Sequence, residues 1–403
     1  MTENINNIEN EMTEENVLIV KYGEIAIRKN NRKFFVEKLL RTIRKNLDPI
    51  GDYYVVKEQG RLIVEDRGGE IDFDKVIPKI ICIMGIIGVS PGVRVKDQSI
   101  DNLKRVCAKH MRMIGAENYR TFKIETKRSN KNYPLVSREV SAAVGEHILE
   151  KFTNLTVDVH NPELTVYIEL RNDAYIYSKQ IKGFGGLPVG SSGKGIVMLS
   201  GGIDSPVSAF LMAKRGVEVE GVYFNSPPYT SERAKQKVVD LAEKLTEFTG
   251  GFRLYVAPFT DIQLYLLENV PHDKLTIFMK RAMTRIACIL GERDGALAVI
   301  TGDSVGQVAS QTMQGLHAIS SAATMPILRP LAGFDKQEII DIAVKIGTFD
   351  ISTRPYEDCC TIFVDKHPET KPKTTVIERI ESHLDKLDEL IEKAVNEVEI
   401  IEM

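Results

Sequence analysis

The sequence predicts an α/β protein whose C-terminal part folds as a doubly wound parallel sheet. From residue 195 onward, apolar runs rich in β-branched residues alternate with longer amphipathic segments, which is the order of strands and helices in such a sheet. The first apolar run, residues 195–199, is followed by a glycine-containing turn and a helical segment that opens with Pro206. With 403 residues the chain is long enough for two or three domains, so further folds are expected before this sheet.

The N-terminal part alternates strands and helices in another order. Residues 1–16, rich in Asn and Glu, are predicted to form a disordered leader. The elements predicted next are a strand at 17–22, a basic amphipathic helix at 31–46, a strand pair at 53–56 and 61–64 with a turn at Gln59-Gly60, and a helix near 74–84. This order is that of a ferredoxin-like domain, which we expect to occupy residues 17–75.

A second N-terminal domain is predicted from residue 76 to residue 182. Its expected elements are helices at 100–113 and 137–152 and strands at 121–126, 164–170 and 174–180. A basic loop, residues 127–133, follows the first of these strands and contains a single aromatic residue. In this loop Lys127, Arg128 and Lys131 suit phosphate contacts. Tyr133 suits stacking on a base.

Residues 183–403 are predicted to form the parallel-sheet domain, entered through a glycine-rich linker at 183–195. Its strands are expected at 195–199, 217–224, 252–256 and 297–301, and its helices at 206–215, 231–249, 275–293 and 305–313. A helix at 337–346 and an acidic amphipathic helix at 375–398 complete it. Ligands bind such sheets at the carboxyl ends of the strands, which is where the turn after residue 199 lies.

Charge is distributed unevenly along the chain. Residues 17–182 carry a net charge of +9, whereas residues 1–16 carry −5 and residues 183–403 carry −7, which gives −3 for the whole chain. A basic N-terminal half joined to a mildly acidic half suits a module that binds a polyanion attached to a catalytic module. The alternative is that Lys and Arg only cover solvated faces.

Membrane, secretory and metal-cluster classes are not indicated. No window approaches eighteen uninterrupted apolar residues, and the first sixteen residues carry five acids and no Lys or Arg, so we expect a cytosolic protein. The cysteines form an odd set without a C-x-x-C pair, namely Cys82, Cys107, Cys288, Cys359 and Cys360. This set indicates neither a disulfide framework nor a zinc or iron–sulfur site.

The turn Ser200-Gly201-Gly202-Ile203-Asp204-Ser205 is the segment most indicative of chemistry. Glycines let the backbone approach a ligand, and successive N–H groups at a helix N-terminus form a site for an anion such as pyrophosphate. The segment resembles the pyrophosphate loop, S-G-G-x-D-S, of ATP pyrophosphatases, which split ATP into AMP and pyrophosphate. An ordinary glycine-rich turn is the alternative. A Walker A loop is excluded, because Gly193-Lys194 has Pro188 in place of its first glycine and Gly195 in place of Ser or Thr.

Four segments together resemble the bacterial tRNA 4-thiouridine synthases, also called tRNA uracil 4-sulfurtransferases. They are Lys21-Tyr22-Gly23-Glu24-Ile25 with Asn31-Arg32, the stretch 127–145, the pyrophosphate loop, and residues 301–311 joined to Pro355-Tyr356-Glu357-Asp358-Cys359-Cys360. The resemblance implies a ferredoxin-like domain, a THUMP domain that holds tRNA and an ATP pyrophosphatase domain. Some members carry a rhodanese domain with a second catalytic cysteine, which this sequence lacks. Sulfur is therefore expected to reach Cys359 or Cys360 directly or through a separate carrier.

The resemblance also implies the residues of each site. ATP is expected to contact Met198, Leu199, Ser200, Gly201, Gly202, Asp204, Ser205, Tyr223, Phe224, Lys280, Arg281, Gly302 and Gln311. RNA is expected to contact Lys127, Arg128, Lys131, Tyr133 and Arg138. The catalytic set comprises Cys359, Cys360, Asp204 and Lys336, with Asp204 positioning Mg²⁺ on the phosphates. Met198, Leu199, Tyr223 and Phe224 suit core packing as well as they suit nucleotide contact, and the Lys and Arg residues suit a solvated surface.

The implied reaction is ATP-dependent sulfur transfer to tRNA. Uridine 8 is adenylated at O4, a Cys359 persulfide replaces the oxygen to give 4-thiouridine, and a cysteine desulfurase supplies the sulfur. Cys360, Cys107 or an external thiol would resolve the intermediate. A homodimer is a candidate assembly, although the sequence does not determine the oligomeric state. The alternatives are a related amidotransferase or ligase that adenylates a small acceptor for attack by ammonia, and an RNA-binding protein with a degenerate nucleotide fold.

Overall fold

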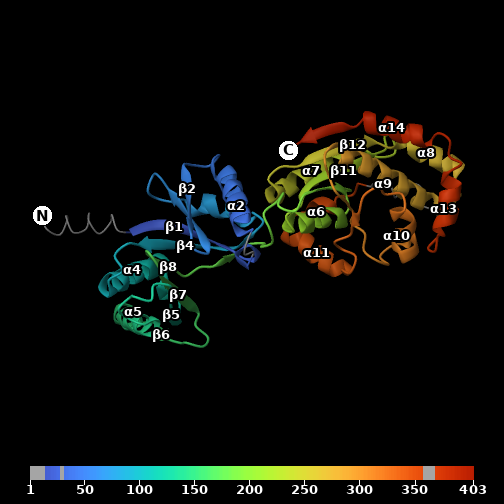
Figure 1. The fold of residues 1–403 in the computed structure, drawn as a ribbon. Coiled ribbons are helices and arrows are strands. Elements are labelled where there is room, and N and C mark those ends of the chain that lie inside the picture. Colours follow the sequence, from blue (N-terminus) through green and yellow to red (C-terminus); the bar gives the residue numbers. More distant parts are fainter. Residues whose placement is uncertain (1–13, 28–30, 357–367) are drawn as a thin grey trace. The chain divides into compact units, whose positions relative to one another are not determined.

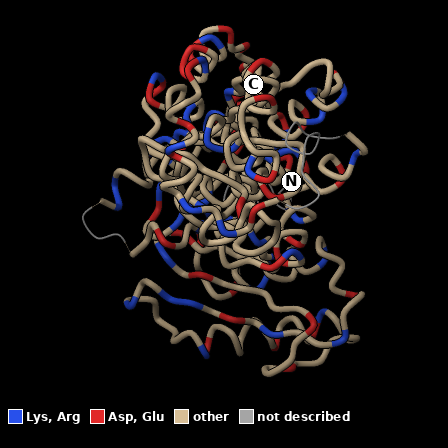
Figure 2. The backbone as a smooth tube through the Cα atoms, turned by 90° about the vertical axis from the view of Figure 1, so that its right-hand side faces the viewer, with Lys and Arg blue, Asp and Glu red and all other residues tan. Residues whose placement is uncertain are grey.

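The computed structural model describes residues 14–27, 31–356 and 368–403. The chain divides into two compact units, an N-terminal unit of residues 1–185 and a C-terminal unit of residues 186–403 (Figure 1). Acidic and basic residues are interspersed along the chain (Figure 2). None of the described helices is both long and apolar enough to cross a bilayer.

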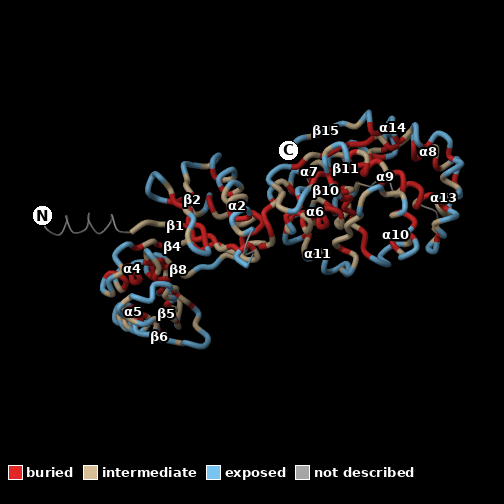
Figure 3. The backbone as a smooth tube through the Cα atoms, in the orientation of Figure 1, coloured by how far each residue is buried: buried red, intermediate tan, exposed pale blue. Residues whose placement is uncertain are grey.

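The N-terminal unit is built on one nine-stranded sheet in the order β2-β3-β1-β4-β8-β7-β5-β6, with β9 also paired to β4. Its elements are β1 (Glu14–Tyr22), η1 (Glu24–Ile27), α2 (Arg32–Leu47), β2 (Tyr53–Glu58), β3 (Arg61–Asp66), α3 (Phe73–Ile81), β4 (Ile86–Val95), α4 (Ile100–Met113), η2 (Ala116–Asn118), β5 (Thr121–Arg128), α5 (Ser137–Lys151), β6 (Thr156–Val157), β7 (Leu164–Leu170), β8 (Ala174–Tyr177) and β9 (Ile181–Lys182). Apolar residues of α4, α5, β4, β5, β7 and β8 form a buried core. Figure 3 colours the buried residues of the chain red.

Strand β4 joins the two predicted N-terminal domains into this one sheet, and the sequence analysis did not predict it. It pairs antiparallel with β1 on one side and with β8 on the other. Gly88, Pro91 and Gly92 interrupt its apolar pattern and resemble a turn. At Gly92 an added Cβ would lie 2.7 Å from the carbonyl oxygen of Ile176. The glycine is therefore required by a close neighbouring strand, which only the tertiary structure reveals.

Strand β1 begins earlier than predicted. Residues 1–13 lie outside the described part of the chain, but residues 14–16, assigned above to the leader, belong to β1 and pair with β4. Ion pairs hold this start of the strand: the Glu14 carboxylate lies 3.0 Å from Lys109 Nζ, and the Glu15 carboxylate lies 3.1 Å from Lys96 Nζ. The predicted domain boundaries near residues 75 and 182 stay predictions.

The C-terminal unit contains a six-stranded sheet in the order β14-β13-β10-β11-β12-β15. Its strands are β10 (Lys194–Met198), β11 (Glu218–Asn225), β12 (Arg253–Pro258), β13 (Val299–Ile300), β14 (Ile327–Leu328) and β15 (Glu399–Glu402). The first five run parallel, and β15 pairs antiparallel with β12 at one edge. The predicted doubly wound parallel sheet is thus confirmed.

The helices of this unit form two groups that lie against the sheet. One group contains α6 (Asp204–Lys214), α7 (Glu232–Thr249), α11 (Lys336–Lys345) and α12 (Phe349–Ser352). The other contains α8 (Thr260–Asn269), α9 (Leu275–Arg293), α10 (Met313–Ser320), α13 (Thr374–Glu381) and α14 (Leu387–Asn396). Ile196 of β10 packs in the core shared with α9. Its neighbour Val197 is equally buried and is not part of that core, as expected for a strand covered on both faces.

Two predicted helices of this unit are wrong. The helix predicted at 305–313 is a turn at Gly306, with φ of +77°, a short 3-10 helix η4 (Ala309–Gln311) and then α10, whose N-cap is Thr312. The single acidic helix predicted at 375–398 consists of α13 and α14, followed by strand β15. Leu384, between the two helices, is buried and continues the apolar period across the break. Helix α8 and strands β14 and β15 were not predicted.

Candidate functional site

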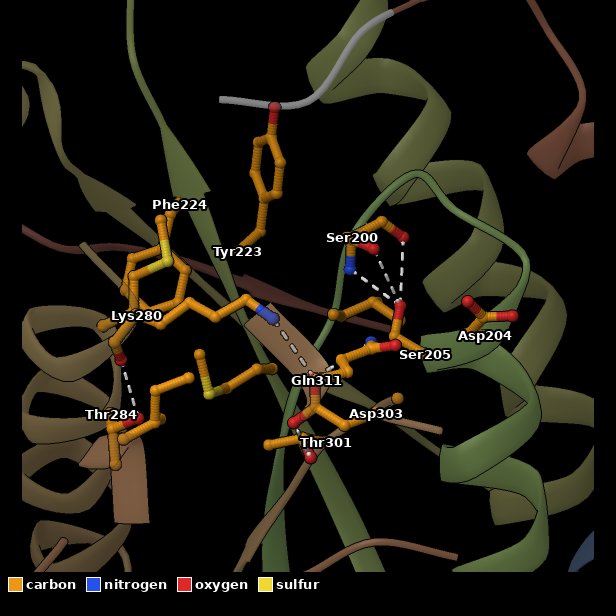
Figure 4. Close-up of a pocket in the computed structure, with 15 residues that line it drawn as sticks. Ser200, Asp204, Ser205, Tyr223, Phe224, Lys280, Thr284, Thr301, Asp303 and Gln311 are labelled. Carbon is orange, nitrogen blue, oxygen red and sulfur yellow. Dashed lines mark hydrogen bonds and ion pairs between the residues drawn. The ribbon is translucent and has the colours of Figure 1, made fainter. Parts of the chain in front are cut away.

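The loop between β10 and α6 is braced by its own serines. The Ser200 N–H donates to Ser205 Oγ at 2.9 Å, and the two hydroxyl oxygens lie 3.1 Å apart. The Gly202 N–H donates to Ser200 Oγ at 3.3 Å. These bonds tie the end of the strand to the first turn of α6, so the backbone between them is held in one conformation (Figure 4).

A cavity of about 200 Å³ opens beside this loop at the carboxyl ends of β10, β11 and β13. Ten residues predicted to contact ATP line it, namely Met198, Leu199, Ser200, Asp204, Ser205, Tyr223, Phe224, Lys280, Gly302 and Gln311. Gly201 and Gly202 lie in the adjoining loop and are not among the lining residues. Residues from five separate segments of the chain therefore converge where the topology of a parallel sheet places a ligand.

Asp204, at the start of α6, forms an ion pair with Lys336. Lys336 Nζ lies 2.5 Å from Asp204 Oδ1, and Gln307 Nε2 donates to Asp204 Oδ2 at 3.1 Å. Lys336 is the first residue of α11, whose N-cap is Asp335. A cation in the first turn opposes the helix dipole. The contact with Asp204 offsets this unfavourable position and brings together two predicted catalytic residues that are 132 positions apart.

Lys280 and Arg281, adjacent on α9, have different surroundings. Lys280 lines the cavity. The Arg281 side chain is only 3% exposed, and it bonds to the Glu381 carboxylate, to Ser321 Oγ at 2.7 Å and to the Ala318 carbonyl. Consecutive residues of a helix point about 100° apart, and here Lys280 faces the cavity whereas Arg281 is not among its lining residues. Arg281 instead ties α9 to α10 and α13.

Position 302, just after β13, has room only for glycine, because the chain that enters α6 packs against it. A Cβ added there would lie 2.8 Å from the Ser205 backbone nitrogen and 3.0 Å from the Asp204 carbonyl carbon. The first turn of α6 therefore packs closely against this position. Any larger residue would displace the loop.

Five lining residues were not predicted: Met283, Thr284, Thr301, Asp303 and Ile319. Of these, Asp303 is the most informative, because its carboxylate accepts from Lys280 Nζ and from Gln311 Nε2, both at 3.2 Å. Burial alone would raise the pKa of Asp303, but the Lys280 ammonium, the Thr301 hydroxyl and the Arg329 guanidinium hold that pKa below its usual value. Its place directly after Gly302 at a strand end was the available signal.

The predicted RNA-binding loop between β5 and α5 is braced by two of its own residues. Arg128 donates to the carbonyl oxygens of Tyr133, at 2.9 Å, and Leu135, at 3.0 Å. The Tyr133 hydroxyl donates to the Gln98 carbonyl at 2.6 Å, and its ring packs against the core. The cations exposed to solvent in this region are Lys127, Lys131 and Arg138.

The predicted catalytic cysteines, Cys359 and Cys360, lie outside the described residues. The chain just before them is anchored beside the serine-braced loop. Ser352 Oγ donates to the Gly202 carbonyl at 3.2 Å, and Lys237 Nζ donates to the Tyr356 carbonyl at 3.1 Å. Cys107, one of the candidate resolving thiols, is fully buried, and burial raises its pKa to about 12. This disfavours the thiolate that a resolving role needs.

Three family descriptions match successive parts of the chain. Residues 17–90 match a ferredoxin-like domain of the ThiI type, residues 97–179 match the THUMP domain, and residues 190–386 match the family described as thiamine biosynthesis protein (ThiI). The predicted ferredoxin-like and THUMP folds are thereby confirmed.

Curated relatives and solved structures match almost the whole chain. A probable tRNA sulfurtransferase of Lachnoclostridium phytofermentans is 47% identical over 384 residues, 95% of this chain and 98% of that protein. One of Thermoanaerobacter pseudethanolicus is 49% identical over 359 residues, 89% of this chain and 93% of that protein. A crystal structure of a 4-thiouridine synthetase in complex with RNA and bound ATP has a TM-score of 0.89 at 38% identity, and the match covers 96% of this chain and all of that one.

Proposed function

This chain belongs to the tRNA sulfurtransferase family, and we propose that it adenylates uridine 8 of tRNA at O4 and replaces that oxygen with persulfide sulfur to give 4-thiouridine. Membership makes it an enzyme that transfers sulfur to tRNA with the use of ATP. The observation that supports the finer reaction is the cavity at the carboxyl edge of the parallel sheet. There a loop with anion-binding geometry, Lys280 and an apolar wall meet, and Lys336 pairs with the lining residue Asp204.

In this proposal the cavity binds ATP. The backbone N–H groups of residues 200–204 and the hydroxyls of Ser200 and Ser205 hold the pyrophosphate portion. The apolar wall of Met198, Leu199, Tyr223 and Phe224 receives adenine and ribose. Lys280 and Lys336 offset phosphate charge as it develops on the leaving group.

Mg²⁺ fits the same arrangement through Asp204. Within the described residues no group of three His, Cys, Asp or Glu side chains is placed to hold a metal ion, so ATP would have to supply oxygens in addition to the Asp204 carboxylate. Bound in this way, Mg²⁺ would neutralise charge on the phosphates. Asp204 would exchange its present partner Lys336 for the ion, which frees the ammonium to contact a phosphate.

Adenylation is needed because the uracil C4 carbonyl is a poor electrophile with oxide as its leaving group. Attack of O4 on the α-phosphorus releases pyrophosphate and turns the oxygen into part of an AMP leaving group. The terminal sulfur of a Cys359 persulfide then attacks C4, and AMP departs with the C–O bonding electrons. A second thiol cleaves the remaining S–S bond, which leaves sulfur on C4 and a disulfide on the protein side. Cys360 and an external thiol remain candidates for that step.

The RNA-binding surface of the proposal comprises Lys127, Lys131 and Arg138, with Arg128 and Tyr133 shaping the loop that carries them. We expect tRNA affinity to fall steeply with salt, because phosphate contacts dominate such binding. A cysteine desulfurase is proposed as the sulfur donor and the cytoplasm as the location. A homodimer stays a prediction.

Reconstitution tests the proposal. Purified protein is incubated with unmodified tRNA, Mg-ATP, cysteine and a desulfurase, and both AMP release and the near-ultraviolet absorbance of 4-thiouridine are followed. Cys359→Ala should abolish thiolation while tRNA binding is kept, and Cys82→Ala, a cysteine in the other unit, should leave both unchanged. An undiminished absorbance from Cys359→Ala would contradict the mechanism. ATP turnover that requires ammonia and a small acceptor, without RNA, would favour the amidotransferase or ligase alternative.

A further inference from the structure

Asp303 is a buried carboxylate that receives donors on both oxygens. Oδ1 accepts from Lys280 Nζ and Gln311 Nε2, each at 3.2 Å. Oδ2 accepts from the Thr301 hydroxyl at 2.8 Å and lies 3.5 Å from Arg329 Nε. These partners come from α9, from η4 and from the chain just after β13 and just after β14. Figure 4 shows Asp303 with three of them, Lys280, Gln311 and Thr301.

Most of the acceptor capacity of Asp303 is used within the protein. An ionised carboxylate offers about four acceptor positions and no donor. Three of them accept hydrogen bonds from Lys280, Gln311 and Thr301, and the Arg329 guanidinium lies beside the carboxylate as an ion-pair partner. A direct role as a ligand is therefore disfavoured, and its effect on the cavity is exerted through the side chains that it holds.

Asp303 determines how Gln311 faces the cavity. Because the carboxylate only accepts, the amide must turn Nε2 toward it and Oε1 away. Gln311 Oε1 is buried and has no hydrogen-bond partner among the described residues. Such an atom is costly to leave unpaired, so it is suited to accept from a ligand. Gln311, expected from the sequence to contact ATP, would therefore do so as an acceptor.

Asp303 also fixes Lys280. A lysine side chain has a flexible four-carbon stem, and its ammonium is ordered here by one carboxylate oxygen at the cavity wall. The same oxygen holds Gln311, so the positions of the two groups are coupled. A cation and an acceptor are thereby presented to the cavity in one fixed arrangement.

We propose that Asp303 is the positioning residue of the cavity, which holds the Lys280 ammonium as a phosphate partner and orients Gln311 as an acceptor for a donor group of ATP. The proposal rests on the proposed function only in taking ATP as the ligand. Asp303→Asn keeps the shape but lets the Gln311 amide turn and releases Lys280. We expect the kcat of tRNA-dependent AMP formation to fall about 10- to 100-fold.

The same change should alter ATP affinity by less than about threefold, because lost ordering of Lys280 and gained positive charge act in opposite directions. A residue needed only for folding would not separate kcat from KM in this way. The matched control is Asp294→Asn. Asp294 is also an ion-paired carboxylate of this unit, bonded to Lys194 at 2.7 Å and Arg253 at 2.6 Å. The Asp294→Asn variant should leave both kcat and KM unchanged.

Calorimetric titration of Mg-ATP into four proteins tests the coupling: wild type, Asp303→Asn, Lys280→Met and the double variant. Lys280→Met should weaken binding about tenfold alone and less than about twofold when Asp303→Asn is already present. Equal effects of Lys280→Met in both backgrounds would overturn the proposal, as would a wild type that binds no ATP. ATP binding with the expected coupling but no thiolation would refute the proposed function and leave this inference standing.

If Asp303→Asn does not fold, Thr301→Val is the second variant. It leaves the carboxylate charged but removes the donor on Oδ2. The same separation of kcat from KM on a smaller scale would support the proposal, whereas a higher KM with unchanged kcat would overturn it.

Discussion

The parallel strands of the six-stranded sheet begin at its amino edge and end at its carboxyl edge. Ion-paired carboxylates lie at both of these edges, but only the carboxyl edge has the features of a binding site. At the amino edge, Lys194 Nζ lies 2.7 Å from Asp294 and 2.9 Å from Glu220, while Arg253 lies 2.6 Å from Asp294 and 2.6 Å from Glu402. At the carboxyl edge, Asp303 pairs with Lys280 and Arg329, and Asp204 pairs with Lys336.

The charge balance of these two clusters differs in sign. In the described ion pairs named above, the amino-edge cluster has two bases against three acids, whereas the carboxyl-edge cluster has three bases against two acids. The carboxyl edge also has the serine-braced loop and the cavity. Ion pairing by itself therefore does not mark a site. A binding site is indicated where cations outnumber carboxylates beside a cavity and a helix N-terminus, because together these features attract and hold an anion.

The largest expected effect is at Lys336. Lys336→Met removes the cation that pairs with Asp204 and is proposed to contact the phosphates, and we expect thiolation to slow about 10²- to 10³-fold. The rate of thiolation is measured as the formation of 4-thiouridine in a single turnover. Lys345→Met, at the other end of α11, is the matched control and should retain the wild-type rate. Equal rates for the two variants would remove Lys336 from the site.

A substitution at Gly302 tests whether the position of the serine-braced loop matters as much as the charges at the carboxyl edge. Gly302→Ala introduces a Cβ 2.8 Å from the Ser205 nitrogen, and we expect AMP formation to fall about tenfold or more as the loop shifts. Gly333→Ala is the control, since its added Cβ meets no atom within 4 Å. If Gly302→Ala is as active as Gly333→Ala, the cavity tolerates a displaced loop.

At the amino edge we expect the opposite pattern, a loss of stability without a loss of rate. Lys194→Met removes one of the two cations shared by Glu220 and Asp294, and Arg253 stays as the other. Because the cluster is partly exposed, we expect the free energy of unfolding to fall by only about 1–2 kcal/mol, measured by urea denaturation. The kcat of AMP formation in the folded variant should not change, and a fall in kcat would extend the site to this edge.

The smallest expected effect is a pH dependence of stability contributed by Glu220 at the amino edge. Burial, then the neighbouring Asp294 carboxylate, raises the pKa of Glu220 from its ordinary value of 4.5 to about 7. Between these values the folded protein keeps a proton that the unfolded chain has released, so the free energy of unfolding contributed by Glu220 falls as the pH rises from 4.5 to 7. Glu220→Gln should flatten this slope in urea midpoints measured across that range. An unchanged slope would assign it to another group.

Local features were predictable because their causes are local. The strand at 195–199, the loop after it and the helix that follows were expected from apolar periodicity, two glycines and a proline, and the structure places them within a residue or two of the predicted bounds. Most of the predicted ATP contacts line the cavity, since the carboxyl ends of parallel strands meet at one edge. Strand β4 was not predicted, because its glycines and proline resemble a turn until neighbouring strands are placed on both sides of it.

The sequence alone determined the fold class, the family and the serine-braced loop, because backbone conformation, periodicity and a short motif depend on residues that are neighbours in the chain. Only the tertiary structure decided which side chains meet. It placed Lys336 beside Asp204 across 132 positions, turned Lys280 toward the cavity and Arg281 away from it, and placed Asp303 where one carboxylate oxygen accepts from both Lys280 and Gln311. These outcomes depend on the packing of α9, α11 and the strand ends, and no local signal in the chain encodes that packing.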